Sequence, residues 1–364
     1  MKVAIIHYWL VAMRGGERVL ERLLTLYPQA DIFTHVYDPD AMSALIRSHK
    51  VTTSFIQKLP GATRRYQSYL PLMPLALEQF DLREYDLVIA SEAGPAKGVI
   101  TRPDALSLCY CHSPMRYIWD QYPVYRAQAG AVTRMLMPML SHKLRLWDTV
   151  SASRVDSFSS NSAFVRSRVR KFYGRDAQVI HPPVPIDDFA IGEAGDHYLW
   201  LSQLVPYKRP DLVVDAFNAN GLPLLIVGDG PCAADVRKRA KGNIRFETRL
   251  NYAGLRDAYA RARALIFTAE EDFGIVPVEA QASGRPVIAY GRGGALETVV
   301  DGSTGLFFYE QTADALNDAI RRFEGWLPGF EPEVAREHAR KFAPERFDEQ
   351  FRAFVEQGID RRFS

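Results

Sequence analysis

Residues 268–284 have the sequence TAEEDFGIVPVEAQASG, and the expected fold is built around this stretch. Two acidic residues, Glu271 and Glu279, lie on either side of a loop that turns at Gly274. The apolar run 264–267 before the loop is typical of a buried strand, and residues 285–289 are expected to form the next strand. Strand, loop, helix and strand make a βαβ unit, whose loop lies at the edge where open α/β sheets bind ligands.

The chemistry of this loop indicates a nucleotide sugar. A helix that begins near Gly274 has unpaired backbone N–H groups, which favour an anion such as a diphosphate, so residues 273–276 (Phe273, Gly274, Ile275 and Val276) are candidate donor-binding residues. Carboxylates accept hydrogen bonds in pairs, so Glu271 and Glu279 suit the vicinal hydroxyls of a ribose or a sugar ring. The alternative is a solvated acidic loop before an ordinary helix, because short motifs often match by chance.

Residues 198–308 resemble, with little interruption, the E-x7-E region of the retaining glycosyltransferases of family 4. The resemblance implies the GT-B fold, an α/β architecture of two Rossmann-like, doubly wound domains that face each other across a cleft. It also implies that Glu279 binds the ribose hydroxyls and that Glu271 binds the transferred sugar. The implied reaction needs no metal and no other cofactor.

A second donor-binding segment is expected at residues 202–210, SQLVPYKRP. Pro210 suits the first turn of a helix, so Lys208 is expected at a helix N-terminus, where its charge and the backbone both attract phosphate. The resemblance implies that Lys208 holds the donor diphosphate and stabilises the charge that develops on this leaving group. Family members usually have arginine where this sequence has Gln203, so that contact is either weakened or supplied by Arg209.

The N-terminal half of the chain offers a glycine loop. The apolar run 2–7 is expected to be a strand, and Gly15 and Gly16 separate it from a helix, so the missing Cβ atoms would let a ligand approach the backbone. A plain tight turn is the alternative. The family has a similar Gly-Gly-x-Glu loop close to the donor diphosphate, which implies that Gly15 and Gly16 belong to the donor site. Glu17 either belongs to this site or caps the helix.

A histidine follows the strand expected at 106–110. His112 would lie at the ligand-binding edge of the sheet, although a lone histidine is more often structural. The stretch YCHSPMRYIWD resembles the H-x-P loop of the family, which implies that His112 contacts the transferred sugar. Arg116 and Tyr117 are then acceptor-side candidates. The predicted catalytic group is His112, Lys208 and Glu271.

Two segments rich in aromatic, apolar and basic residues have other expected roles. Residues 59–82, with Arg64 and Arg65, suit a membrane interface or a lipid-linked acceptor. Packing of this segment into the N-terminal core is an equal alternative, because its prolines interrupt an amphipathic helix. Residues 122–147 are expected to form helices on the acceptor side, and their charges exclude a membrane span.

Length and composition set the remaining expectations. A chain of 364 residues suggests two domains. The expected boundaries are 1–187 for the acceptor domain, 188–343 for the donor domain and 344–364 for a helix that returns to the first domain; HPPVP at 181–185 marks the linker. A net charge of +2 argues against nucleic-acid binding, and three cysteines without metal or CxxC spacing suggest a reducing compartment.

The predicted function is transfer of a hexose to a lipid-linked or polysaccharide acceptor in the synthesis of a bacterial surface glycan such as lipopolysaccharide. The first choice of donor is a GDP-linked mannose or deoxyhexose, because the His112 loop and residues 204–209 resemble bacterial mannosyl- and deoxyhexosyl-transferases. The expected location is the cytoplasm, with peripheral contact at the inner membrane left open. The alternatives are a GT-B sugar-nucleotide epimerase or phosphorylase, and a non-catalytic nucleotide-sugar-binding subunit, to which Gln203 lends some support.

Overall fold

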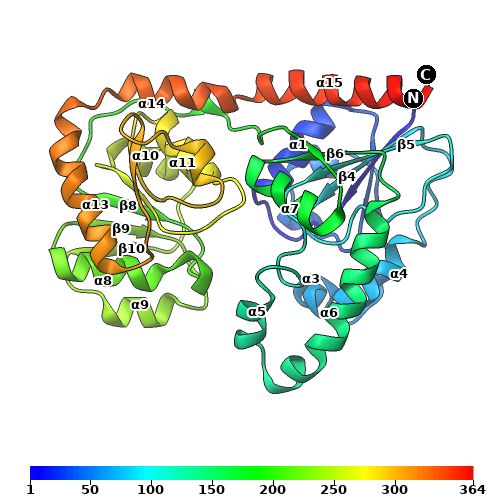
Figure 1. Ribbon diagram of the computed structural model, residues 1–364, viewed down its shortest axis with the longest axis horizontal. Coiled ribbons are helices and arrows are strands. Elements are labelled where there is room, and N and C mark those ends of the chain that lie inside the picture. The colour runs from blue at the N-terminus through cyan, green and yellow to red at the C-terminus, as the bar shows by residue number, and fades with distance from the viewer. Residues whose placement is uncertain (364) are drawn as a thin grey trace. The chain divides into compact units, whose positions relative to one another are not determined.

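The computed structural model describes residues 1–363, which form two compact units (Figure 1). Unit 1 comprises Met1–Pro183 together with the residues from Phe347 onward, and unit 2 comprises Val184–Arg346. The division falls within the proline-rich stretch 181–185. Each unit is an α/β domain with its own parallel sheet, so the predicted fold class is confirmed.

Unit 1 contains, among the described residues, a seven-stranded sheet in the order β3-β2-β1-β4-β5-β6-β7. The strands are β1 (Val3–His7), β2 (Asp31–Thr34), β3 (Val51–Thr53), β4 (Leu87–Glu92), β5 (Leu106–Cys111), β6 (Ser157–Ser160) and β7 (Ala177–Val179). All neighbouring strands are parallel. The strand order reverses between β1 and β4, and such a switch point is where doubly wound sheets bind ligands.

The helices of unit 1 pack against this sheet or extend away from it (Figure 1). They are α1 (Gly15–Leu26), α2 (Ala44–Arg47), α3 (Ala62–Arg65), α4 (Met73–Leu77), α5 (Tyr122–Gln128), α6 (Ala131–Ala152), α7 (Ala163–Tyr173) and α15 (Pro344–Phe363). The α1 helix buries Val19, Leu20, Leu23 and Leu24, whose 3.6-residue repeat predicted it. Successive side chains of a strand face opposite sides, so Val3 and Ile5 join one apolar cluster and Ala4 and Ile6 join another.

The C-terminal helix belongs largely to unit 1. Phe347, Phe351, Phe354 and Val355 of α15 lie in the same buried cluster as the side chains of β1 and α1. The Arg22 guanidinium of α1 donates two hydrogen bonds to the Asp348 carboxylate of α15, which ties the two helices together. The apolar stripe at helical spacing is therefore core of the first domain.

Unit 2 contains, in the described part of the chain, a six-stranded parallel sheet in the order β10-β9-β8-β11-β12-β13. Its strands are β8 (Tyr198–Leu201), β9 (Leu224–Val227), β10 (Ile244–Glu247), β11 (Leu265–Phe267), β12 (Val287–Tyr290) and β13 (Gly305–Phe308). Its helices are α8 (Pro210–Asn220), α9 (Ala233–Arg239), α10 (Tyr252–Arg261), α11 (Ile275–Ala282), α12 (Ala295–Thr298), α13 (Ala313–Trp326) and α14 (Pro332–Ala339). The switch point lies between β8 and β11.

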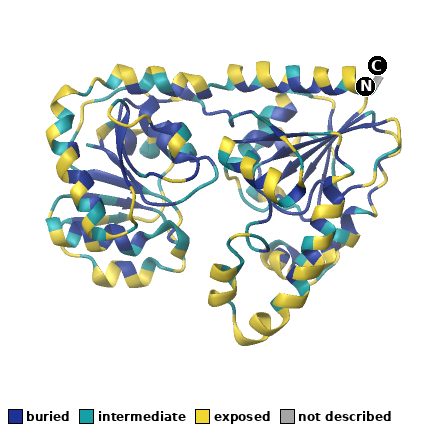
Figure 2. Ribbon diagram, viewed as in Figure 1, coloured by how far each residue is buried: buried dark blue, intermediate teal, exposed yellow. Residues whose placement is uncertain are grey.

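One part of unit 1 is much more exposed than the rest. The α5 helix and the first half of α6 extend away from the sheet (Figure 1), and most of their residues are exposed (Figure 2). Residues 122–147 were predicted to be helical, which is confirmed. Within residues 1–363, no helix combines the length and the apolar character that crossing a bilayer would require.

Candidate active site

The loops at the switch point of unit 2 bring two of the predicted residues into contact. Lys208 follows β8 and Glu271 follows β11, and their Nζ and Oε1 atoms lie 2.7 Å apart. The two side chains remain 16% and 23% exposed, so the ion pair is accessible to solvent. A lysine at this edge of the sheet, paired with a carboxylate that can also accept hydroxyl groups, fits a ligand that carries both phosphate and sugar.

The backbone around Lys208 is tightly held. Lys208 ends a short 3-10 turn, η5 (Pro206–Lys208), two residues before α8 begins, rather than standing on the helix itself. Its carbonyl accepts a hydrogen bond of 2.8 Å from the Thr268 hydroxyl, which in turn accepts one of 3.1 Å from the Trp200 indole. These bonds tie the loop after β8 to the loop after β11, so the position of Lys208 relative to Glu271 is fixed by the sheet.

Gln203 and Arg209, the two residues considered for a phosphate contact beside Lys208, have different surroundings. Gln203 is exposed in the loop after β8. Arg209 adopts the left-handed conformation, with φ of 57°, which is strained for a residue with a Cβ atom. Its guanidinium donates to Asp211 at 3.1 Å and to the Gln311 carbonyl at 3.3 Å. Arg209 is thus engaged at the start of α8, and a new phosphate contact by Arg209 would compete with these bonds.

Glu279 is buried on α11, with 4% of its surface exposed. The Tyr259 hydroxyl of α10 donates a 2.7 Å hydrogen bond to its Oε2 atom. A carboxylate oxygen has several acceptor sites, so Tyr259 orients the group while the carboxylate keeps the capacity to accept from a diol. The sequence did not identify Tyr259, because its contact depends on how α10 packs against α11.

The first turn of α11 begins directly after Gly274, at the end of the loop that follows β11. Gly274 caps the helix at φ of 91°, a conformation that favours glycine. The preceding Phe273 is buried against Phe342, and Ile275 and Val276 at the start of the helix are half-buried. The apolar side chains anchor the loop, while the first backbone N–H groups of the helix have no partner within the helix.

A glycine pair that the sequence did not connect with this site shapes it. A Cβ atom on Gly293 would lie 2.4 Å from the Glu271 carbonyl oxygen, and one on Gly294 would lie 2.3 Å from Phe273 backbone atoms. The Gly294 N–H also donates to the Glu271 carbonyl at 2.8 Å. Glycine is therefore required at both positions for the loop after β12 to support the acidic loop.

At the switch point of unit 1, a chain of buried polar groups leads to His112. Ser91 at the end of β4 lies between two histidines: its Oγ atom is 2.9 Å from His112 Nε2 and 3.0 Å from His7 Nδ1. The backbone N–H of His112 donates to the Glu92 carbonyl at 2.8 Å, which holds the backbone of the loop beside the end of β4. Burial, with a smaller effect of His7, lowers the pKa of His112 to about 3, so this ring is neutral at physiological pH.

The glycine loop joins this chain through α1. Glu17 is buried, accepts a 2.8 Å hydrogen bond from the Arg14 N–H, and lies 3.5 Å from His7 Nε2. Glu17 therefore caps α1, as one of the two sequence interpretations held. Gly15 and Gly16 form the first residues of the helix, and a Cβ atom on Gly16 would lie 2.3 Å from the Tyr8 hydroxyl. Gly16 thus permits a close approach of Tyr8 that any larger residue would prevent.

Directly behind the His112 loop lies a buried charged cluster that the sequence did not reveal. Lys97 Nζ contacts Glu92 Oε1 at 2.9 Å and also Asp148, and all three side chains are fully buried. Tyr173 donates to Asp148 at 3.0 Å, and the Trp119 indole donates to the same carboxylate at 2.7 Å. Burial raises the pKa of Glu92, whereas the two carboxylates raise the pKa of Lys97 despite its burial. The cluster joins β4, α6, α7 and the loop after β5.

The acceptor-side candidates lie at and near this loop. Arg116 is half-buried. Tyr117 packs into a small apolar cluster with its hydroxyl buried, so it is better suited to shaping the loop than to donating to a ligand. Arg64 and Arg65 are exposed on α3. Arg168 of α7, which the sequence did not single out, supports the loop by donating to Ser113 Oγ at 2.7 Å.

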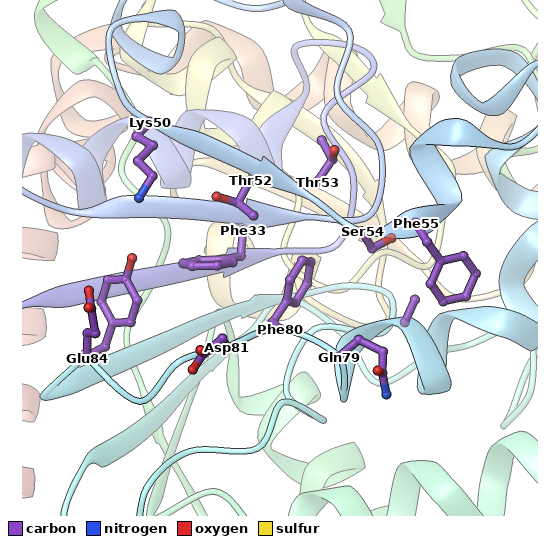
Figure 3. Close-up of a pocket in the computed structure, with 12 residues that line it drawn as sticks. Phe33, Lys50, Thr52, Thr53, Ser54, Phe55, Gln79, Phe80, Asp81 and Glu84 are labelled. Carbon is purple, nitrogen blue, oxygen red and sulfur yellow. The ribbon is translucent and has the colours of Figure 1, made fainter.

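Unit 1 also has an open pocket of about 430 Å³ beside β2 and β3 (Figure 3). Phe33 and Phe80 form its apolar floor, with ring centroids 5.2 Å apart. Lys50, Asp81 and Glu84 supply charges at its margin. None of the predicted site residues lines this pocket. For metal ions, no group of three or more histidine, cysteine or acidic side chains suited to binding one is found in residues 1–363.

Residues 187–325, all within unit 2, match the family described as Glycosyl transferases group 1. A GDP-mannose-dependent alpha-(1-6)-phosphatidylinositol monomannoside mannosyltransferase of Mycobacterium tuberculosis is 29% identical over 54% of this chain and 61% of that protein. An alpha-1,3/1,6-mannosyltransferase of Schizosaccharomyces pombe is 26% identical over 66% of this chain and 54% of that protein. The alignments thus span less than two thirds of either relative. They support a glycosyltransferase.

Solved structures of similar fold cover nearly the whole chain. Sucrose-phosphate synthase of Thermosynechococcus elongatus aligns with a TM-score of 0.73 and 17% identity over 99% of this chain and 100% of that chain. HepE of Anabaena, solved with UDP and glucose, aligns with a TM-score of 0.69 and 16% identity over 98% and 99%. At such identities the likeness concerns the fold, and it shows that both Rossmann-like domains match those of GT-B glycosyltransferases.

Proposed function

We propose that this chain is a retaining glycosyltransferase that moves a hexose from a GDP-sugar, with mannose or a deoxyhexose as first choice, to a lipid-linked or polysaccharide acceptor. The observation that carries the proposal is the contact between Lys208 and Glu271 at the switch point of unit 2, beside the buried Glu279. The donor assignment is supported by the mannosyltransferases among the similar proteins, one of which is named as GDP-mannose-dependent. We place the reaction in bacterial surface glycan synthesis.

In this proposal the donor diphosphate lies between Lys208 and the first turn of α11. Glu279, oriented by Tyr259, accepts hydrogen bonds from the ribose hydroxyls. When the diphosphate binds, Lys208 exchanges its ion pair with Glu271 for the phosphate, and Glu271 becomes available to the hydroxyls of the hexose. After the exchange Lys208 pairs with the phosphate charge and the Glu271 carboxylate accepts hydrogen bonds from neutral hydroxyls, so both groups keep a hydrogen-bonding partner.

The proposed chemistry depends on stabilising the leaving group. The bond between the anomeric carbon and the diphosphate oxygen breaks, and the negative charge on that oxygen is stabilised by Lys208 and by the N–H groups of α11. The acceptor hydroxyl attacks from the same face and passes its proton to the departing diphosphate, so configuration is retained. We propose that this reaction needs no metal, and that His112 in unit 1 contacts the transferred sugar.

The experiment that tests the function is a transfer assay with radiolabelled GDP-mannose, UDP-glucose and ADP-glucose against a panel of lipid-linked acceptors. Wild-type protein is expected to use the GDP-sugar, and Lys208→Ala is expected to lower kcat more than it weakens donor binding. Lys241→Ala, an exposed lysine elsewhere in unit 2, is the matched control. Donor binding without transfer would instead favour the non-catalytic subunit, and donor turnover without acceptor would favour the epimerase or phosphorylase.

We further propose that unit 1 rests on an anionic membrane surface, as expected for an enzyme with a lipid-linked acceptor. The α6 helix exposes an apolar stripe at helical spacing, interrupted by Lys143, opposite its buried face. The stripe consists of Val132, Met135, Leu136, Met139, Leu146 and Val150, which are 40–73% exposed. Exposed apolar patches of this kind mark interaction sites.

The charges near this stripe favour a bilayer over a second copy of the chain. Residues 122–147 contain Arg126, Arg134, Lys143 and Arg145 and no acidic residue. Pairing two such faces around a two-fold axis would place like charges together, whereas anionic lipids attract each basic residue by about 1 kcal/mol. The segment with Arg64 and Arg65 contacts the buried face of α6 through the cluster that contains Leu70, Leu144 and Trp147, and it adds two exposed basic residues to unit 1.

Vesicle co-sedimentation tests this surface. Vesicles that contain phosphatidylglycerol are expected to bind wild-type protein, and vesicles of phosphatidylcholine to bind it weakly. Met135→Ser/Met139→Ser and Arg64→Glu/Arg65→Glu should each reduce binding, whereas Val334→Ser, an exposed apolar position in unit 2, should not. Binding equal to wild type in both double variants would contradict the proposal. A change of oligomeric state in Met135→Ser/Met139→Ser, with vesicle binding intact, would indicate a second copy instead.

A further inference from the structure

Three buried groups lead to His112 through hydrogen bonds, and of these the sequence motifs pointed only to Glu17. The β1 and β4 strands are adjacent, and their register pairs His7 with Ser91. The side chains of these two residues and of Glu17 are buried, so water does not compete for their hydrogen bonds. The contacts Glu17–His7, His7–Ser91 and Ser91–His112 measure 3.5, 3.0 and 2.9 Å and form one continuous chain.

The Glu17 carboxylate determines which group donates and which accepts at each hydrogen bond between Glu17 and His112. A carboxylate accepts hydrogen bonds and donates none, so His7 must donate to Glu17 through its Nε2–H. A neutral imidazole has one donor and one acceptor, which leaves His7 Nδ1 to accept from the Ser91 hydroxyl. With its proton used in this way, Ser91 Oγ can only accept from His112. His112 then carries its proton on Nε2, and Nδ1 is the acceptor of the ring.

We propose that Glu17, His7 and Ser91 are positioning residues that hold His112 in the Nε2–H tautomer, so that its Nδ1 atom accepts a hydrogen bond from a substrate hydroxyl. The proposal rests on the function proposed above for the identity of that hydroxyl, which belongs to the transferred sugar or to the acceptor. Rigid buried partners restrict ring rotation as well as the tautomer, and such restriction is what a precisely aligned contact requires.

The surroundings of the ring agree with this assignment. Tyr110 and Tyr8 pack edge-on against His112, with centroids 5.0 and 6.4 Å away, so they add apolar contact around the ring. The same Glu17 that begins the chain caps α1 beside Gly15 and Gly16. The glycine loop and the His112 loop, which are about a hundred residues apart in sequence, are thereby linked through side chains rather than through a ligand.

The donor and acceptor roles between His7, Ser91 and His112 can also be reversed, and an experiment can detect this reversed arrangement. A doubly protonated His7 would donate to Ser91 through Nδ1, and Ser91 would then donate to His112 Nε2. His112 would carry its proton on Nδ1 and offer a donor to substrate. The two arrangements therefore predict opposite tautomers for the same set of distances.

Nitrogen-15 NMR of histidine-labelled wild-type protein at pH 7.5, without substrate, decides between them. The eight histidines of the chain allow assignment by single His→Gln variants. The proposal predicts a protonated, pyrrole-type Nε2 and an unprotonated, pyridine-type Nδ1 for His112. The reversed pattern, or a mixture of both tautomers, would overturn it. Because no ligand is used, this result stands whether or not the protein transfers a sugar.

Kinetics of Ser91→Ala test the positioning role. The variant breaks the chain next to His112 and is expected to lower kcat roughly tenfold with little change in the donor KM, and its NMR spectrum should show both His112 tautomers. Ser159→Ala removes a buried hydroxyl from β6 of the same sheet, outside the chain, and should leave both quantities unchanged. Wild-type kcat in Ser91→Ala, or an equal loss in Ser159→Ala, would show that the chain does not position His112 for the reaction.

Discussion

The two units place their candidate residues at the same topological point and build it from opposite chemistry. In unit 1 the switch point holds His7, Ser91 and His112, which are joined by hydrogen bonds, and the first two are fully buried. In unit 2 it holds Lys208 and Glu271, an ion pair that remains partly exposed. The comparison indicates that unit 1 holds the His112 side chain in a fixed orientation. Unit 2 instead presents a lysine–glutamate ion pair that a charged ligand can separate.

The largest expected effect is a loss of stability when Lys97 of unit 1 is replaced. Lys97→Met removes the cation of the buried cluster and leaves Glu92 and Asp148 facing each other without compensation. Such a change should lower the free energy of unfolding by about 3–5 kcal/mol. Urea denaturation followed by circular dichroism measures this loss, with Lys171→Met, an exposed position on α7, as control. A loss below about 1 kcal/mol would contradict the structural role of the cluster.

The next effect is a dependence of stability on pH in unit 1. Burial lowers the pKa of His35 to about 4, so the folded state keeps His35 neutral while the unfolded state takes up a proton below about pH 6.5. Stability should therefore fall as pH decreases from 6.5 to 4.5, and His35 should account for roughly 2–3 kcal/mol of that fall. The slope is expected to flatten in His35→Gln. If the variant and the wild type show the same slope, His35 is not the group responsible.

Catalysis should show its larger effect in unit 2. Glu279→Ala removes the buried carboxylate that we propose accepts from the ribose hydroxyls, and each such charged hydrogen bond contributes about 1.5–3 kcal/mol. The expected loss in kcat/KM is roughly ten- to a hundredfold. Tyr259→Phe, which removes the hydroxyl that orients Glu279, should cause a smaller loss in the same parameter. Steady-state kinetics with GDP-mannose provides both values, and an unchanged kcat/KM in Glu279→Ala would refute its role.

The sequence predicts a feature when that feature depends on residues close together in the chain. It does not predict features that depend on contacts between residues far apart in sequence. The strands expected at 2–7, 106–110 and 264–267 form within one residue of the predicted bounds, because each is a short buried apolar run. The edge strand Val51–Thr53 was missed, since its three half-buried residues carry no apolar run. The positions of Lys208 and Glu271 follow from motifs beside strands, whereas the Lys97 cluster and the Ser91 chain depend on contacts between residues as much as 84 positions apart.

The smallest expected effect is the loss of stability when Lys208 of unit 2 is replaced. Lys208→Met should change the free energy of unfolding by about 1 kcal/mol or less, because partly exposed ion pairs contribute little after solvent screening. The measurement is the same urea titration used for Lys97→Met. A loss comparable to that of Lys97→Met would mean that the Lys208–Glu271 pair serves the fold rather than a ligand.

Isothermal titration calorimetry of the full chain with GDP, UDP and ADP tests the central claim, that unit 2 binds a nucleoside diphosphate through Lys208, Glu279 and the start of α11. Wild-type protein is expected to bind GDP more tightly than UDP or ADP, with binding weakened at least tenfold in Glu279→Ala and unchanged in Lys241→Ala. If no nucleoside diphosphate binds, or if Glu279→Ala binds GDP as tightly as the wild type does, the proposed donor site is wrong.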